Sequence, residues 1–346
     1  MGLFRKAQPA PEPTPIDGAD FLYLDLDGVV YKGPHAIPHA VESIVATGLP
    51  TAFLTNNASR TDAEVAEHLR SFGLPVEPGD VVTSPQAAML LLERHLQPGD
   101  PVLVVGGAGI VVEIEARGWR VVRTAAEQPK AVVQGFHPTV GWNDLAEASF
   151  ALARKPEHGG IPWIATNGDW TIPVAGGIAP GNGTLVSAVH TAVGRLAEFA
   201  GKPETPMFDV AAARFGARSP VMIGDRLDTD ILGARRAGIR SIAVLTGIDR
   251  GASLIGADPS MRPDHVIEDL RDLQQPILPV RETLETSTRA MYFEVGRAAV
   301  RRSGIDITLV RAGDRPVDTI RAACAAVWSA DRPVLGLRVA DELLAL

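Results

Sequence analysis

The chain has 346 residues, of which 46% are hydrophobic and 21% are charged, a balance typical of a globular protein with two or more domains. Its formal charge of −8, without a long run of Lys and Arg, argues against nucleic acid or an anionic membrane as the main partner. Because Cys324 is the only cysteine, an intramolecular disulfide and a cysteine-based metal cluster are excluded, which favours a reducing, cytoplasmic setting.

The N-terminal segment, residues 1–17, is rich in proline and has no apolar core, so we expect a disordered tail rather than a signal peptide. No segment of the chain reaches the roughly 20 apolar residues that a membrane-spanning helix needs. We therefore expect no membrane partner.

From residue 20 onward, short runs of Val, Ile and Leu alternate with helical patterns. Strands are expected at 21–27, 51–57, 80–84, 101–107, 119–123, 130–136, 162–167, 220–225 and 241–247. Helices are expected at 62–73, 143–155, 183–199 and 208–216. This alternation predicts an α/β fold with a Rossmann-like, doubly wound parallel sheet, in which ligands bind at the carboxyl ends of the strands.

Polar residues follow three of these apolar runs, and a fourth element contributes a lysine. Asp25 and Asp27 end the first strand, Thr55 and Asn56 end the second, and Asp225 follows the strand "PVMIG", with Asp230 shortly after. Lys202 lies in "AGKPETP", at the start of a helical pattern. Each signal alone has an ordinary explanation: an Asp-Gly turn, a turn-forming threonine or a solvated lysine. Their occurrence together, in this order, is much harder to explain by packing.

These residues suit phosphoryl-transfer chemistry. Asp25, Asp27 and Asp225 offer oxygen ligands, which favour a hard cation such as Mg²⁺. With the repulsion between carboxylates relieved by a cation, one of them can attack phosphorus and form an aspartyl-phosphate. Lys202 and the hydroxyl of Thr55 are suited to holding phosphate oxygens.

The motifs "DLDGVVY", "FLTNN", "GKP" and "IGDRLDTDI" resemble, in this order, the four motifs of the haloacid dehalogenase superfamily of phosphohydrolases. The pattern is closest to subclass IIA, with its NagD-like and 4-nitrophenylphosphatase-like members, and the long insertion resembles the C2 cap of that subclass. The resemblance covers about residues 18–275 and implies a Mg²⁺-dependent phosphatase. The full arrangement of motifs also resembles that of actinobacterial glycerol-3-phosphate phosphatases. Among small phosphate esters, we therefore rank glycerol 3-phosphate first as the expected substrate.

The resemblance assigns roles to the core residues. Asp25 is the nucleophile and a Mg²⁺ ligand, and Asp27 is the general acid/base, ligating through its carbonyl. Thr55, Asn56 and Lys202 bind phosphate, and Lys202 also counts as catalytic. Asp225 completes the metal ligands and Asp230 orients them from outside. An acid two residues after the nucleophile also serves leaving-group chemistry, which favours a phosphatase over a dehalogenase.

The predicted domains are a core of residues 18–89 and 196–276, a cap of 90–195 and a C-terminal α/β extension of 277–346. Substrate specificity is expected in the cap, because core residues contact only the phosphoryl group. Candidate specificity residues on cap loops are His137, Trp142, Asn143, Asp169 and Trp170. Caps of this subclass often pair between subunits, which makes a homodimer plausible.

The extension, 277–346, predicts strands at 290–296, 305–311 and 334–339 and a helix at 317–328. It resembles a truncated acetyltransferase-like unit. It contains no glycine-rich pyrophosphate loop, so we assign it no chemistry and hypothesise a structural or regulatory role.

Several alternatives remain open from the sequence. Nucleoside monophosphates, pyridoxal 5′-phosphate and phosphoglycolate are other possible substrates, and a phosphomutase or a non-catalytic sensor of phosphorylated metabolites are other possible functions. A dinucleotide-binding oxidoreductase is disfavoured, because the glycines at 106, 107 and 109 lack the third glycine of that fingerprint and the next strand does not end in an acidic residue.

Overall fold

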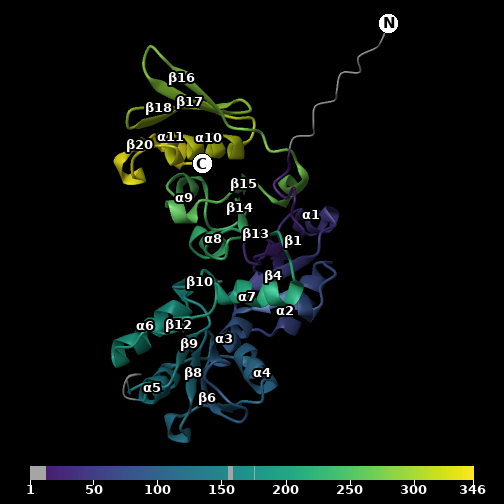
Figure 1. Cartoon of the computed structure of the whole chain (residues 1–346), viewed down its shortest axis with the longest axis vertical. Helices are drawn as coiled ribbons and strands as arrows, with labels where there is room; N and C mark the ends of the chain where they lie inside the picture. Colours follow the sequence, from purple (N-terminus) through teal and green to yellow (C-terminus); the bar gives the residue numbers. More distant parts are fainter. Residues whose placement is uncertain (1–12, 155–158, 175) are drawn as a thin grey trace.

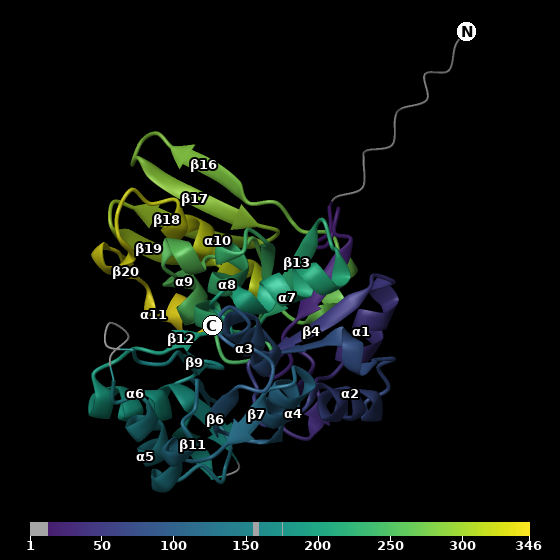
Figure 2. The same cartoon turned by 60° about the horizontal axis from the view of Figure 1, so that its bottom comes forward.

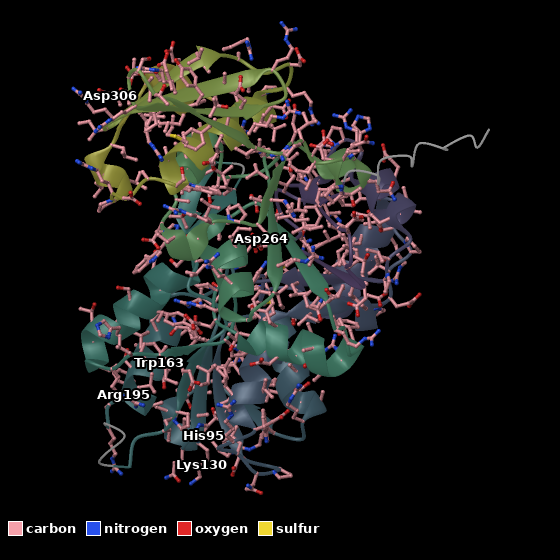
Figure 3. The ribbon with its side chains drawn as sticks, turned by 45° about the horizontal axis from the view of Figure 1, so that its top comes forward. His95, Lys130, Trp163, Arg195, Asp264 and Asp306 are labelled. Carbon is pink, nitrogen blue, oxygen red and sulfur yellow. The ribbon has the colours of Figure 1, made fainter. Side chains whose placement is uncertain are left out.

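In the computed structural model, which describes residues 13–154, 159–174 and 176–346, the chain forms three units stacked along its long axis (Figure 1). The core lies in the middle, an inserted cap lies at one end, and the C-terminal unit lies at the other. Figure 3 marks the two ends, with Asp306 on the C-terminal unit and His95 and Lys130 on the cap. None of the helices in the described ranges has both the length and the apolar character needed to cross a bilayer.

The core is built on a six-stranded sheet in which all neighbouring strands are parallel. In spatial order its strands are β15 (His265–Ile267), β14 (Arg240–Val244), β13 (Pro220–Gly224), β1 (Phe21–Leu24), β4 (Thr51–Thr55) and β5 (Val81–Thr83). The predicted α/β fold with a parallel sheet is confirmed.

Helices cover both faces of the core sheet, as alternation of side chains along each strand requires. Leu22 and Leu24 pack on one face with α1 (Ala40–Thr47) and α2 (Asp62–Ser71). Tyr23, between them in the sequence, packs on the other face with α3 (Ser84–Leu92) and α7 (Pro206–Phe215). Further short core elements include the hairpin β2 (Tyr31–Lys32) and β3 (His35–Ala36), the turn η4 (Leu227–Ile231), α8 (Leu232–Arg236) and α9 (Gly251–Ile255).

The cap carries a second parallel sheet of five strands. Its strands, in spatial order, are β12 (Glu198–Phe199), β9 (Trp163–Ala165), β8 (Ala131–Gln134), β6 (Pro101–Val105) and β7 (Arg120–Val122). Its helices are α4 (Ala108–Ala116), α5 (Trp142–Ala151) and α6 (Asn182–Val193), and β10 (Thr171–Val174) pairs with β11 (Gly177–Pro180) as a hairpin.

The apolar interior of the cap continues into that of the core. Buried residues of α3 belong to one hydrophobic cluster with Leu54 of the core sheet and with Val102 and Val133 of the cap sheet. Because interiors are close-packed, a cap joined in this way is positioned by side-chain packing as well as by its two chain connections.

The C-terminal unit is a twisted sheet covered by one long helix. Its strands are β16 (Arg281–Glu285), β17 (Ala290–Val295), β18 (Ala298–Ser303), β19 (Asp306–Arg311) and β20 (Arg338–Val339), followed by α11 (Asp341–Leu344). Helix α10 (Pro316–Trp328) packs on this sheet and faces α9 of the core, as Figures 1 and 2 show. Phe293, Ile320 and Leu254 share one buried cluster, so the unit is docked on the core.

The structure differs from the sequence-based expectations at the end of helix α6, at the boundary of the cap and in the N-terminal tail, among other places. The helix predicted over 183–199 is confirmed as α6 up to Val193, but its predicted end is wrong, because Gly194 adopts a left-handed φ of 65° and Glu198–Phe199 form β12. Pairing of β12 with β9 therefore extends the cap sheet beyond the predicted boundary at residue 195. Residues 1–12 of the predicted tail lie outside the described residues. Residues 13–17 are packed, because Ile277 N–H donates to the Pro13 carbonyl at 2.9 Å and Pro15 is buried.

Candidate active site

The predicted core residues meet at the carboxyl edge of the core sheet. β1 pairs in parallel with β4 on one side and with β13 on the other, so the ends of these three strands are neighbours. Asp25 follows β1, Thr55 ends β4 and Asp225 follows β13. A cavity of about 510 Å³ opens there between core and cap, and all seven predicted core residues line it.

Lys202 lies at the centre of the buried charges. Its Nζ is 2.5 Å from Oδ1 of Asp25 and 2.7 Å from Oδ1 of Asp230, and it donates to the Leu54 carbonyl at 2.9 Å. Burial alone would lower the pKa of the Lys202 amine, but Asp230 and Asp25 outweigh it and hold that pKa above its ordinary value. The raised pKa favours the charged form of Lys202, which is a hydrogen-bond donor beside Asp25.

Asp25, Asp225 and Asp230 form a carboxylate cluster, with one oxygen of each within 4.8 Å of the others. Burial, followed by the charges of Asp25 and Asp230, raises the pKa of Asp225 to about 8. Burial also raises the pKa of Asp230, to about 6, although Lys202 opposes this. Three such groups ionise together only with additional positive charge.

Asp225 shows that the cluster fits a hard cation. Its Oδ2 accepts a hydrogen bond from Ile248 N–H at 2.7 Å, whereas its buried Oδ1 has no hydrogen-bond partner among the described residues. A Cβ at Gly247 would lie 1.8 Å from Oδ2, so only glycine lets the backbone approach this carboxylate. A fixed carboxylate with a free buried oxygen, beside Asp25, is the donor set that Mg²⁺ prefers.

Asp27 is the exposed carboxylate of the site, at the wall of the same cavity. Desolvation by the surrounding protein raises the pKa of Asp27, while the charge of Arg60 and a hydrogen bond with the Tyr31 hydroxyl oppose this shift. The main chain next to it is held by a hydrogen bond from Gly28 N–H to the Tyr31 carbonyl at 2.8 Å. Asp27 can thus exchange protons with a ligand or water in the cavity.

Thr55 and Asn56 differ in whether their side chains still have a hydrogen-bond donor available for a ligand. The Thr55 hydroxyl is buried and accepts from Asn57 N–H at 3.1 Å, which leaves its own O–H to donate into the cavity. The amide N–H groups of Asn56 already donate to Lys202 and Asp169.

The cap contributes a different set of residues from the predicted one. Of the specificity candidates, Asp169 lines the cavity, whereas His137, Trp142, Asn143 and Trp170 do not. The ring of His137 packs against Gly107 and pairs with the Thr139 hydroxyl at 2.7 Å. Trp142 and Trp170 are 78% and 64% exposed to solvent. A strand end alone therefore does not say toward which side a loop side chain turns.

Other cavity residues escaped the sequence analysis. Among these are Lys32, Phe136, Thr171, Ile172, Asn182 and Arg226. Thr171 and Ile172 begin strand β10. Their closeness in the sequence to the predicted Asp169 was the signal that could have identified them as cavity residues. Arg226 follows the predicted Asp225 and binds Asp228 through two nitrogens, at 3.0 and 2.7 Å.

Comparisons with known proteins agree with this geometry. A family model described as "Haloacid dehalogenase-like hydrolase" matches residues 22–120, and a second HAD-hydrolase-like model matches residues 199–273. The chain is 40% identical over 312 residues to a D-glycerol 3-phosphate phosphatase of Mycobacterium tuberculosis, covering 90% of this chain and 86% of the relative. A 5′-nucleotidase of Bacillus subtilis is 32% identical, covering 72% of this chain and 95% of the relative.

The chain is also similar to solved structures of phosphatases. A glycerol phosphate phosphatase from Mycobacterium tuberculosis in complex with magnesium has a TM-score of 0.82 at 37% identity, covering 95% of each chain. A 4-nitrophenylphosphatase from Thermotoga maritima has a TM-score of 0.67 at 30% identity, covering 75% of this chain and 97% of the other. The similarity to the first structure includes the C-terminal unit, since it spans nearly the whole chain.

Proposed function

The chain belongs to the haloacid dehalogenase-like hydrolases, and from that premise we propose that it hydrolyses glycerol 3-phosphate, with Asp25 as the nucleophile. It is a phosphoric monoester hydrolase of small phosphate esters, and Mg²⁺ is its cofactor. The choice of glycerol 3-phosphate is supported by the names of relatives from Mycobacterium tuberculosis and Gallus gallus, the latter 34% identical over 293 residues.

The main support for this mechanism is the ion pair between Lys202 and Asp25, in which Nζ of Lys202 lies 2.5 Å from Oδ1 of Asp25. The phosphoryl group of the substrate takes the place beside them, with its oxygens bound by Lys202 and the Thr55 hydroxyl. Asp25, Asp225 and the Asp27 carbonyl would hold Mg²⁺, which would neutralise negative charge on the carboxylates and on the phosphate. Positioning and charge neutralisation supply most of the catalysis in phosphoryl transfer.

In the first step a carboxylate oxygen of Asp25 attacks phosphorus. The bond from phosphorus to the glycerol oxygen breaks, its electron pair stays on that oxygen, and Asp27 donates the proton that completes the alcohol. Glycerol leaves and Asp25 carries the phosphoryl group as an acyl phosphate.

In the second step Asp27 accepts a proton from water as the water oxygen attacks phosphorus. The bond from phosphorus to the Asp25 oxygen breaks and its electrons return to the carboxylate. Inorganic phosphate leaves, and both aspartates are restored to their starting states.

The test is phosphate release from a panel containing glycerol 3-phosphate, a nucleoside monophosphate, pyridoxal 5′-phosphate and phosphoglycolate, with and without Mg²⁺. We expect glycerol 3-phosphate to have the highest kcat/KM and the Asp25→Asn variant to be inactive on every ester. A different best ester would overturn the substrate. An Asp25→Asn variant with full activity would overturn the mechanism.

We further infer that two copies of the chain pair through their caps. Large apolar side chains are exposed on the cap, namely Trp142, Phe150, Trp170 and Ile178. A contact between two caps would remove this apolar surface from water. Light scattering should give the mass of a dimer, and an Ile178→Ser variant should shift it toward a monomer. A monomer at all concentrations would contradict the pairing.

The cytoplasm is the compartment we propose, on the support of the single cysteine, which suits a reducing environment. Cell fractionation with an antibody against the chain would test this. Enrichment outside the cytoplasm would contradict it.

A further inference from the structure

The side-chain amide of Asn56 joins the cap to the backbone of Lys202. Its Oδ1 accepts from Lys202 N–H at 2.9 Å, and its Nδ2 donates to the Lys202 carbonyl at 3.0 Å. The same Nδ2 donates to Oδ1 of Asp169 in the cap at 3.2 Å. A carboxamide has two N–H donors, so both are in use. A contact of this amide with phosphate, as the sequence predicted, would break one of these bonds.

Two adjacent cap strands bring these groups together. β9 and β12 pair in parallel, so their carboxyl ends lie side by side. Asp169 follows β9, and Lys202 follows β12 by three residues. Asn56 lies directly after the core strand β4, so its amide bridges the ends of two cap strands from the core side.

The contact between Asn56 and the cap is tight and has a second anchor. The main-chain carbonyl of Asn56 accepts from Nδ2 of Asn167 at 2.7 Å, and Oδ1 of Asn167 accepts from Asp169 N–H at 3.2 Å. A Cβ at Gly201 would lie 2.5 Å from both Asn56 Oδ1 and the Thr166 carbonyl. The cap loop 166–169 therefore has little freedom to shift without moving Asn56.

We propose that Asp169 is a positioning residue that acts through Asn56 on Lys202. The position of the cap loop 166–169 then determines where the ammonium group of Lys202 contacts the phosphoryl group. This inference rests on the phosphate-binding role proposed above for Lys202. Asp169 would then affect the binding of the phosphoryl group, which all phosphate esters share. Other cap residues would determine which alcohol group the enzyme accepts.

The experiment compares kcat/KM for glycerol 3-phosphate and for 4-nitrophenyl phosphate in Mg²⁺-loaded enzyme. We expect Asp169→Ala to lower kcat/KM about tenfold for both esters, the size of one lost hydrogen bond to a charged group. Asp169→Asn should restore most of this loss, because its amide oxygen can still accept from Asn56. The Asn56→Ala/Asp169→Ala double variant should be no slower than Asn56→Ala alone.

Glu115→Ala, which removes an exposed carboxylate from cap helix α4, is the matched control and should keep full activity. A loss in Asp169→Ala confined to glycerol 3-phosphate would make Asp169 a substrate contact and overturn the proposal. Independent, additive losses in the double variant would also overturn it. Full activity in a Lys202→Ala variant would instead overturn the proposed role of Lys202, whatever the Asp169 variants do.

Discussion

Lys202 and Asp230 form an ion pair with 2.7 Å between Nζ and Oδ1, and their side chains are only 2% and 1% exposed. Asp230 therefore binds the lysine directly, in addition to lying beside the proposed metal ligands. Replacing Lys202 by methionine would leave Asp230 and Asp25 buried without their cation.

We expect Lys202→Met to destabilise the Mg²⁺-free protein by about 3–5 kcal/mol, the typical cost of removing one partner of a buried ion pair. It should also lower kcat/KM by roughly 10²–10³, as the loss of a positioned charge donor does. Urea unfolding and phosphate release measure the two effects. Lys130→Met, at an exposed site on the cap (Figure 3), is the control, and equal stability of the two variants would contradict the prediction.

Asp27→Asn should separate substrates by their leaving groups. An alkyl alcohol needs a proton to leave, so kcat/KM for glycerol 3-phosphate should fall roughly 10²–10⁴-fold. 4-Nitrophenolate leaves without a proton, so kcat/KM for 4-nitrophenyl phosphate should fall much less. Asp209→Asn, at an exposed position of α7, should change neither value. Equal losses on both esters would exclude Asp27 as the acid of the first step.

The pKa of Asp225 predicts how the stability of the Mg²⁺-free protein depends on pH. Folding raises this pKa from 3.8 to about 8, so between these values the folded state holds a proton that the unfolded state has released. Stability should therefore fall as pH rises from about 4 to 8. Mg²⁺ should stabilise the protein more at pH 8 than at pH 5, because the ionised carboxylate binds it.

Asp225→Asn removes this titration. At pH 8 without Mg²⁺ the variant should be more stable than the wild type by about 1–3 kcal/mol, since it removes a buried negative charge that lies beside two other carboxylates. It should also lose most of the stabilisation by Mg²⁺. Urea unfolding at pH 5 and pH 8, with and without Mg²⁺, measures both. A wild type whose stability does not change across this range would contradict the prediction.

The C-terminal unit should be needed for stability. Without residues 280–346, the core residues Leu254 and Val266 would lose those apolar partners of their shared cluster that the C-terminal unit supplies, such as Ile320. We expect the truncated chain to melt at a lower temperature and to aggregate, while the folded fraction keeps its kcat/KM.

Phe293→Ala is a gentler version of the same test in the full chain. Phe293 is fully buried, and its truncation should cost about 3–5 kcal/mol. Leu284→Ala, at a half-exposed position of β16, is the control. A truncated chain as stable and active as the full one would show that the unit has no structural role.

The sequence was sufficient to predict the core site, because parallel strands deliver their last residues to one edge. Asp25, Thr55 and Asp225 could be placed together from strand ends alone, and Lys202 from its motif. The hydrogen bond from Asn56 to Asp169 could not be predicted, since it joins the core to a cap loop more than 100 residues away in the chain.

Elsewhere the pattern was too weak to interpret. β16 and β18 were missed because neither strand alternates between buried and exposed positions. Four consecutive residues of β16 are exposed, and β18 begins with three consecutive buried residues. The β10–β11 hairpin was missed because proline and glycine dominate it, although it supplies Thr171 and Ile172 to the cavity. Its pairing comes from the fold rather than from residue preference.

Lys202 lies three residues beyond β12, on the second of the two chain segments that join cap and core. Any chimaera that exchanges caps between phosphatases must therefore choose whose lysine segment it keeps. A junction placed between Phe199 and Lys202 retains the host lysine but pairs Asn56 with a foreign cap loop. Functional recombination of caps should succeed chiefly between parents whose loops present a carboxylate to this asparagine.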